Sequence, residues 1–156
     1  MMNRVFHLLL TFPLVGSAVH NQALVTVTVD EAVVFTGTNT SIPINIEVME
    51  GYHIQANKVR DEALIPTTLT VTDVKGFTIS KHKFPSAKKF KLDGTNTFLN
   101  VYDGKFSIKL SLRPDTKMKT GKYVLRASLR YQACDSRSCL FPRVIDFLVP
   151  VEVKPK

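Results

Sequence analysis

Two cysteines, Cys134 and Cys139, are the residues of this sequence whose type and spacing most directly suggest chemistry. They lie in the segment YQACDSRSCLFP, residues 131–142, with four residues between them. Such a pair can be a structural disulfide, a metal-binding pair or a reversible dithiol. Closing so short a loop stabilises a fold by only about 2 kcal/mol, and C-x4-C without a nearby histidine is not a standard zinc spacing. Spacing alone leaves a redox-active and a passive surface disulfide open, with metal binding the weakest of the three.

The surroundings of the cysteines are compatible with exchange chemistry. A thiolate attacks a disulfide of another protein, and a second thiol within reach resolves the mixed disulfide. Arg137 lies between the two cysteines and could favour a thiolate, whereas Asp135 would oppose it. In the alternating segment 121–133 that leads into the pair, Cys134 continues the polar phase. We therefore expect Cys134 to point away from the main core if the strand stays regular that far.

The rest of the sequence predicts one all-β domain that positions this pair. The chain has 156 residues, 44% of them hydrophobic, which suits one domain with a core of its own. Apolar residues alternate with polar ones, no stretch sustains a helical period, and turn signals separate the segments. The expected strands are residues 25–29, 42–48, 67–71, 77–80, 97–102, 106–112, 121–133 and 144–153. About eight short strands favour an immunoglobulin-like antiparallel β-sandwich over a barrel.

The N-terminus is predicted to be an export signal. Arg4 precedes an apolar run, and the small residues that end at Ala18 suit cleavage before Val19. The alternative is that this run forms a buried first strand. On the export interpretation residues 1–18 are removed, and residues 19–156 form a single domain in an oxidising, extracytoplasmic compartment. The formal net charge of +8 favours anionic partners without naming one.

Other candidate sites in the sequence are weaker. His53 is expected to be an interior histidine with a satisfied hydrogen bond rather than a ligand or base. Five lysines between Lys81 and Lys91 are expected to form a solvated face, with the steering of acidic partners as the alternative. There is no phosphate-cradling glycine loop and no nucleic-acid-binding signature. We expect a monomer without cofactor or metal that binds no nucleic acid.

Five segments, taken in order, resemble a known family. They are GYHIQANKV (51–59), IPTTLTV (65–71), KFP (83–85), VYDGKFSI (101–108) and YQACDSRSCLFP (131–142). Each is a weak motif, but the ordered set is similar to the N-terminal periplasmic domains of the thiol:disulfide interchange protein DsbD. The resemblance covers nearly all of the chain after the expected signal.

The resemblance implies an immunoglobulin-like domain in the periplasm whose cysteine pair carries electrons. The implied donor is a membrane-embedded DsbD-like protein, and the implied acceptors are thioredoxin-fold proteins. Cys134 and Cys139 become the catalytic pair, and Cys139 is the sulfur that faces the partner. The family also has an aromatic residue on a loop that caps the cysteines, for which Phe90 is the first candidate and Phe98 the second. Core packing is the alternative role for each phenylalanine, and the favoured one for Phe98.

One departure from the family pattern concerns the end of the sequence. DsbD continues into membrane helices and a thioredoxin-like domain, whereas this sequence stops at VEVKPK. We therefore expect either a free-standing relative or a piece of a larger protein.

Two further function classes remain open at this point. A passive secreted binding or adhesion module would keep its function without the cysteines. A metal carrier would use Cys134 and Cys139, with His53 as a possible third ligand.

Overall fold

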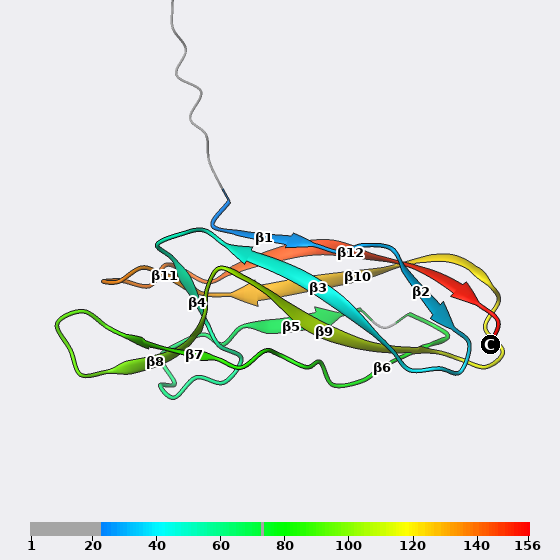
Figure 1. The fold of residues 1–156 in the computed structure, drawn as a ribbon, viewed down its shortest axis with the longest axis horizontal. Helices are drawn as coiled ribbons and strands as arrows, with labels where there is room; N and C mark the ends of the chain where they lie inside the picture. Colours follow the sequence, from blue (N-terminus) through cyan, green and yellow to red (C-terminus); the bar gives the residue numbers. More distant parts are fainter. Residues whose placement is uncertain (1–22, 73) are drawn as a thin grey trace, which may run out of the picture.

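Twelve β-strands make up the regular structure of the computed structural model, which describes residues 23–72 and 74–156. The predicted signal peptide, residues 1–18, lies outside the described residues. Within them no helix is long and apolar enough to cross a membrane. The strands form three four-stranded sheets (Figure 1).

Two of the sheets form the layers of a sandwich. The first sheet has the strand order β1 (Val25–Thr28), β3 (Thr40–Val48), β9 (Lys105–Pro114) and β6 (Phe77–Ile79). The second has the order β2 (Ala32–Phe35), β12 (Arg143–Lys154), β10 (Gly121–Tyr131) and β5 (Thr68–Val71). All of these pairings are antiparallel except that of β2 with β12, which is parallel.

The core lies between these two layers, where the alternating strands place their apolar residues. In β3 the buried positions are Ile42, Ile44, Ile46 and Val48, and the residues between them face outward. Branched side chains of β9, β10 and β12 join them in one cluster. Full burial of one such side chain stabilises the fold by about 1.5–3 kcal/mol. The prediction of an immunoglobulin-like all-β sandwich is confirmed, with one parallel strand pair inside it.

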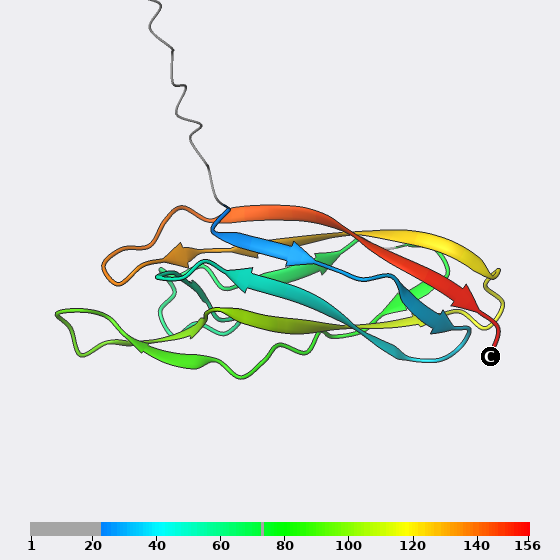
Figure 2. The ribbon, with the colours of Figure 1, turned by 45° about the horizontal axis from the view of Figure 1, so that its top comes forward.

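The third sheet closes one end of the sandwich. Its order is β11 (Ala133–Cys134), β4 (His53–Gln55), β8 (Phe98–Tyr102) and β7 (Lys88–Lys91). Figures 1 and 2 show it at the end opposite the C-terminus, together with the orange hairpin that contains the cysteines and the green connection from β7 to β8. The small sheet therefore brings segments 53–55, 88–102 and 133–134 to the same end of the molecule.

Candidate functional site

The two cysteines form a disulfide across a narrow hairpin that follows β10. The S–S distance is 2.06 Å and the Cα atoms lie 3.9 Å apart. Backbone hydrogen bonds flank the pair on both sides: Asp135 N–H donates to Ser138 O (2.9 Å), and Leu140 N–H donates to Ala133 O (2.8 Å). The cysteines thus occupy a non-hydrogen-bonded position of an antiparallel ladder, where facing Cα atoms are closest.

The turn of this hairpin is held by the Asp135 side chain. Its Oδ1 accepts hydrogen bonds from the backbone N–H groups of Arg137 and Ser138, both at 2.7 Å. These two donors stabilise the carboxylate and hold the pKa of Asp135 below its usual range. Asp135 therefore shapes the loop that spaces the sulfurs.

The two cysteines differ in their exposure to solvent. Cys139 is exposed, whereas Cys134 is 0% exposed. Cys134 lies on the face away from the core cluster, as the alternation predicts, since its neighbour Ala133 belongs to that cluster and Cys134 does not, but it is buried there rather than open to solvent. β10 ends at Tyr131, and after Gln132 the chain pairs with β4 instead, placing Ala133 opposite Ile54 and Cys134 opposite His53.

One face of the third sheet carries the groups around the disulfide. Residues that face each other in register share a side of a sheet, and side chains alternate along each strand. His53 and Gln55 of β4 therefore lie on the side of Cys134, while Ile54 between them belongs to the sandwich core. The Gln55 amide Nε2 lies 3.2 Å from Cys134 Sγ and 3.9 Å from Cys139 Sγ. Sequence reasoning did not identify Gln55 as a site residue.

An aromatic contact adjoins the cysteine strand on the same face. The Phe90 ring of β7 packs on the His53 ring, with centroids 4.1 Å apart. His53 is buried, as expected, and its burial lowers its pKa, although the Asp103 and Asp135 carboxylates act in the opposite direction. The hydrogen bond expected for this histidine is not found at Nε2, which has no partner among the described residues. Phe98 is 50% exposed, so the core-packing role favoured for it was wrong.

Comparison with known proteins decides the family. The model of the family described as "Thiol:disulfide interchange protein DsbD, N-terminal" matches residues 21–150. The chain belongs to this family. A search of curated proteins found no significant match to the sequence.

Solved structures add a similarity of fold to this DsbD N-terminal assignment. The N-terminal periplasmic domain of ScsB from Proteus mirabilis superposes with a TM-score of 0.55 at 14% identity, covering 86% of this chain and 48% of that one. This chain thus spans about half of that ScsB domain. The DsbD N-terminal domain of Neisseria meningitidis in its reduced form gives a TM-score of 0.47 at 12% identity, with 73% and 79% coverage of the two chains.

In this DsbD N-terminal domain, the charged residues that are close to the cysteines in sequence do not bond to the two sulfurs. Arg137 is exposed, and among the described residues no ion pair or hydrogen bond joins an arginine to either sulfur. The lysines of segment 81–91 are all exposed, as expected for a solvated face. One of them, Lys88, forms an ion pair with Asp103 of the β8–β9 connection. In the part of the chain that the structure describes, the side chain that hydrogen-bonds to the sulfurs is the neutral amide of Gln55.

Two clefts border the disulfide site. An open cleft of about 780 Å³ has His53, Phe90, Asp103 and Ser136 in its lining, and so extends from the third sheet to the cysteine hairpin. A smaller cleft of about 250 Å³ is lined in part by Gln55 and Phe98. Both cap candidates therefore lie beside the site, Phe90 on the side of His53 and Phe98 on the side of Gln55.

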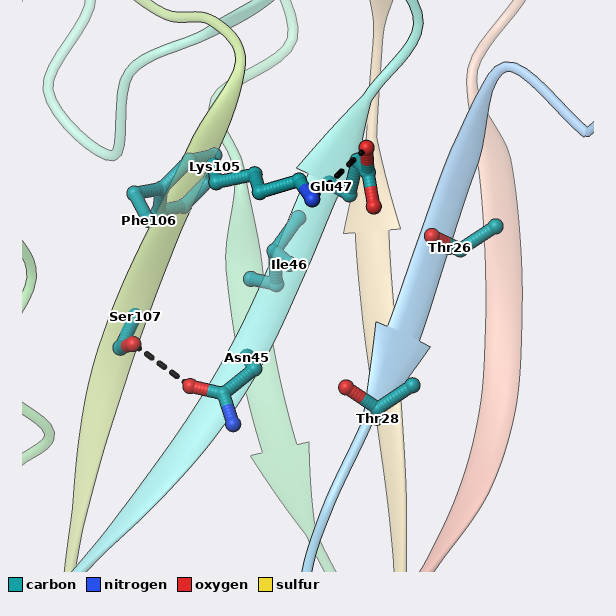
Figure 3. A pocket seen from close by; sticks show the side chains of 8 residues that line it. All are labelled: Thr26, Thr28, Asn45, Ile46, Glu47, Lys105, Phe106 and Ser107. Carbon is teal, nitrogen blue, oxygen red and sulfur yellow. Dashed lines mark hydrogen bonds and ion pairs between the residues drawn. The ribbon is translucent and has the colours of Figure 1, made fainter.

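A third hollow lies on the outer side of the first sheet and contains none of the predicted site residues. Figure 3 shows it between β1, β3 and β9, where Lys105 points toward Glu47 (3.5 Å) and Ser107 donates a hydrogen bond to Asn45 Oδ1 (2.7 Å). These pairs satisfy the polar groups of an ordinary exposed sheet face.

The described residues offer no support for the metal-carrier hypothesis. In residues 23–72 and 74–156, no group of three or more His, Cys, Asp or Glu side chains is placed to hold a metal ion. The DsbD N-terminal family and a disulfide-forming cysteine pair instead support a thiol–disulfide exchange module.

Proposed function

We propose that this domain is an extracytoplasmic electron carrier that works by thiol–disulfide exchange through Cys134 and Cys139. The observation that carries the proposal is the asymmetry of the disulfide, in which Cys139 is exposed and Cys134 is buried. Exchange proceeds by attack on one sulfur while the other leaves as a thiolate. A disulfide between one exposed and one buried cysteine is suited to this sequence of steps.

In the direction of partner reduction, the Cys139 thiolate attacks one sulfur of an oxidised acceptor, and the acceptor's other sulfur leaves as a thiolate. Cys134 then attacks Cys139 Sγ, which closes the 134–139 disulfide and releases the second acceptor sulfur. Two electrons and two protons pass to the acceptor in all. The reverse sequence, with a reduced donor attacking Cys139, regenerates the dithiol.

The partners that fit this chemistry are a membrane-embedded DsbD-like donor and thioredoxin-fold acceptors. The family match supports both, and the segment after Cys139 supplies a surface on which either can dock. Phe141 is 92% exposed, and the half-buried Leu140 lies between it and Cys139. Phe141 therefore offers the partner an exposed apolar ring two residues from Cys139.

The proposed function is tested by an exchange reaction with purified proteins. The reduced domain is mixed with an oxidised thioredoxin-fold protein, and the redox state of each is read by alkylation and mass spectrometry. We expect the acceptor to become reduced as the 134–139 disulfide forms, and a glutathione couple to bring the disulfide to a measurable equilibrium. A disulfide that resists mild reductant and exchanges with no thioredoxin-fold protein would instead indicate a passive binding module.

A cap over the disulfide is part of the proposal, and the contact with His53 favours Phe90 over Phe98 for this role. An aromatic pair contributes about 0.5–1.5 kcal/mol beyond area burial. Phe90→Ala should therefore raise the rate at which a small dithiol reduces the disulfide by about two- to tenfold. Phe98→Ala, which removes a half-exposed ring, is the matched control and should leave this rate unchanged. If only Phe98→Ala accelerates reduction, the cap is Phe98.

A further inference from the structure

We propose that Gln55 is a catalytic residue of the exchange reaction, because its amide N–H is placed to stabilise the thiolate of Cys134 whenever that sulfur attacks or leaves. The inference rests on the proposed function and assigns it a third side chain. The Nε2–Sγ distance of 3.2 Å is within hydrogen-bonding range for a sulfur acceptor, and the second sulfur lies 3.9 Å away. An N–H that contacts both sulfurs remains beside Cys134 when the disulfide opens.

The backbone on both sides holds Gln55 in this position. Its N–H donates to Gln132 O (3.1 Å) on the chain that leads to Cys134, and its carbonyl oxygen accepts a hydrogen bond from Thr67 Oγ1. On the other side of β4, Gln55 pairs with Val101 of β8. The side chain is 0% exposed, so water does not compete for the amide. A donor fixed in a dry site stabilises a developing charge more than the same donor in water.

The orientation of the amide follows from the chemistry of sulfur. A disulfide sulfur carries no hydrogen, so it can only accept, and the amide must present Nε2 to it. The other end of the amide, Oε1, is buried and has no hydrogen-bond partner among the described residues. A buried acceptor without a partner costs free energy. The unpartnered Oε1 of Gln55 therefore lowers the stability of the fold. The hydrogen bond from its Nε2 to the sulfurs provides a functional reason for a glutamine at this position.

The Cys134 sulfur carries negative charge in both directions of exchange. When a donor thiolate attacks Cys139 Sγ, the S–S bond breaks and its electron pair goes to Cys134, where the Gln55 N–H meets it. When the mixed disulfide is resolved, the Cys134 thiolate is the attacking group, and the same hydrogen bond increases the fraction that is ionised. A lower pKa makes a thiol a better leaving group, and burial alone would raise the pKa of Cys134.

The test uses Gln55→Met, which has similar length and no N–H donor, and Gln55→Glu, which keeps the shape and loses the donors when ionised. Each is combined with Cys139→Ser, so that Cys134 is the only thiol, and its ionisation is followed by thiolate absorbance against pH. We expect the pKa of Cys134 to rise by about one unit, which is a tenfold loss of thiolate. In the disulfide-containing forms, reduction by a small dithiol should slow several-fold.

Stability gives a second readout that separates catalysis from support of the fold. Gln55→Met removes the unpartnered Oε1, so its melting temperature should equal or exceed that of the wild type. Gln132→Leu is the control, because the Gln132 side chain donates to Leu140 O of the hairpin (3.2 Å) and accepts from Ile65 N–H (2.9 Å), and among the described residues it has no hydrogen bond to either sulfur. It should lower the melting temperature and leave the Cys134 pKa unchanged.

Two results would overturn the assignment: an unchanged Cys134 pKa in both Gln55 variants, or a pKa that moves equally in Gln132→Leu. Both measurements use only a small dithiol and a single thiol. A failure of the wild-type domain to exchange with thioredoxin-fold proteins would therefore count against the proposed function and not against the role of Gln55.

Discussion

A variant that keeps Cys139 as its only cysteine should capture a thioredoxin-fold protein as a covalent mixed disulfide, whereas a variant that keeps only Cys134 should capture almost none. The reason is access: Cys139 is exposed at the hairpin, and Cys134 is buried beneath it against β4. A buried thiol can resolve a mixed disulfide formed next to it, but a large partner cannot approach it in line.

The capture experiment needs a partner that cannot resolve the complex itself. A thioredoxin-fold protein with one active-site cysteine, activated as a mixed disulfide with a coloured aromatic thiol, reports each attack by release of that thiol. Cys134→Ser should release it rapidly and yield the covalent complex on a non-reducing gel. Capture by Cys139→Ser alone would reverse the roles of the two sulfurs, and capture by neither variant would remove the main support for an electron carrier.

Replacing both cysteines by serine should abolish electron transfer while leaving the fold intact. The disulfide spans a sequence separation of only five residues, so its loss should cost about 2 kcal/mol of unfolding free energy. The hairpin keeps its flanking backbone hydrogen bonds and the Asp135 side-chain bonds at its turn. Urea unfolding gives the stability, and the exchange assay gives the activity.

The two measurements on the double variant distinguish a redox pair from a brace. A single serine replacement is the matched control for loss of the bond, since it also breaks the disulfide but keeps one thiol. A double variant that is unfolded at room temperature would show that the disulfide is structural. A folded double variant that still transfers electrons would place the redox chemistry elsewhere.

The sequence predicted the long strands because each has one buried face. β3 and β9 alternate strictly between core and solvent, so their period of two is visible in the residue types. β2, β4 and β7 were missed, although β1, β5 and β6, which are as short, were predicted. VTVT of β1 and TLTV of β5 alternate between apolar and polar residues, whereas AVVF of β2 and KKFK of β7 do not. In β4 all three residues are buried, which removes the alternation as well.

The sequence also predicted the cysteine pair, but it did not predict the environment of that pair. The alternation placed Cys134 on the face away from the core, but the sequence alone does not reveal that pairing moves to β4 after Gln132 and buries Cys134 there. Gln55 shows the same limit. A glutamine in a three-residue strand reads as an exposed polar residue, and only the tertiary pairing buries it against the sulfurs. Its place within GYHIQANKV, a segment that resembles the family, was the available signal.

The position of the cysteines between two backbone hydrogen bonds has a thermodynamic consequence for the proposed carrier, which would serve two partners. Breaking the S–S bond requires no backbone hydrogen bond of the hairpin to break, because none joins Cys134 to Cys139 directly. The oxidised and reduced forms can then present nearly the same surface. By reciprocity, a partner that binds both forms equally leaves the midpoint potential of the pair unchanged on docking. The direction of electron flow is then set by the potentials of donor and acceptor, and each complex dissociates as readily after exchange as before it.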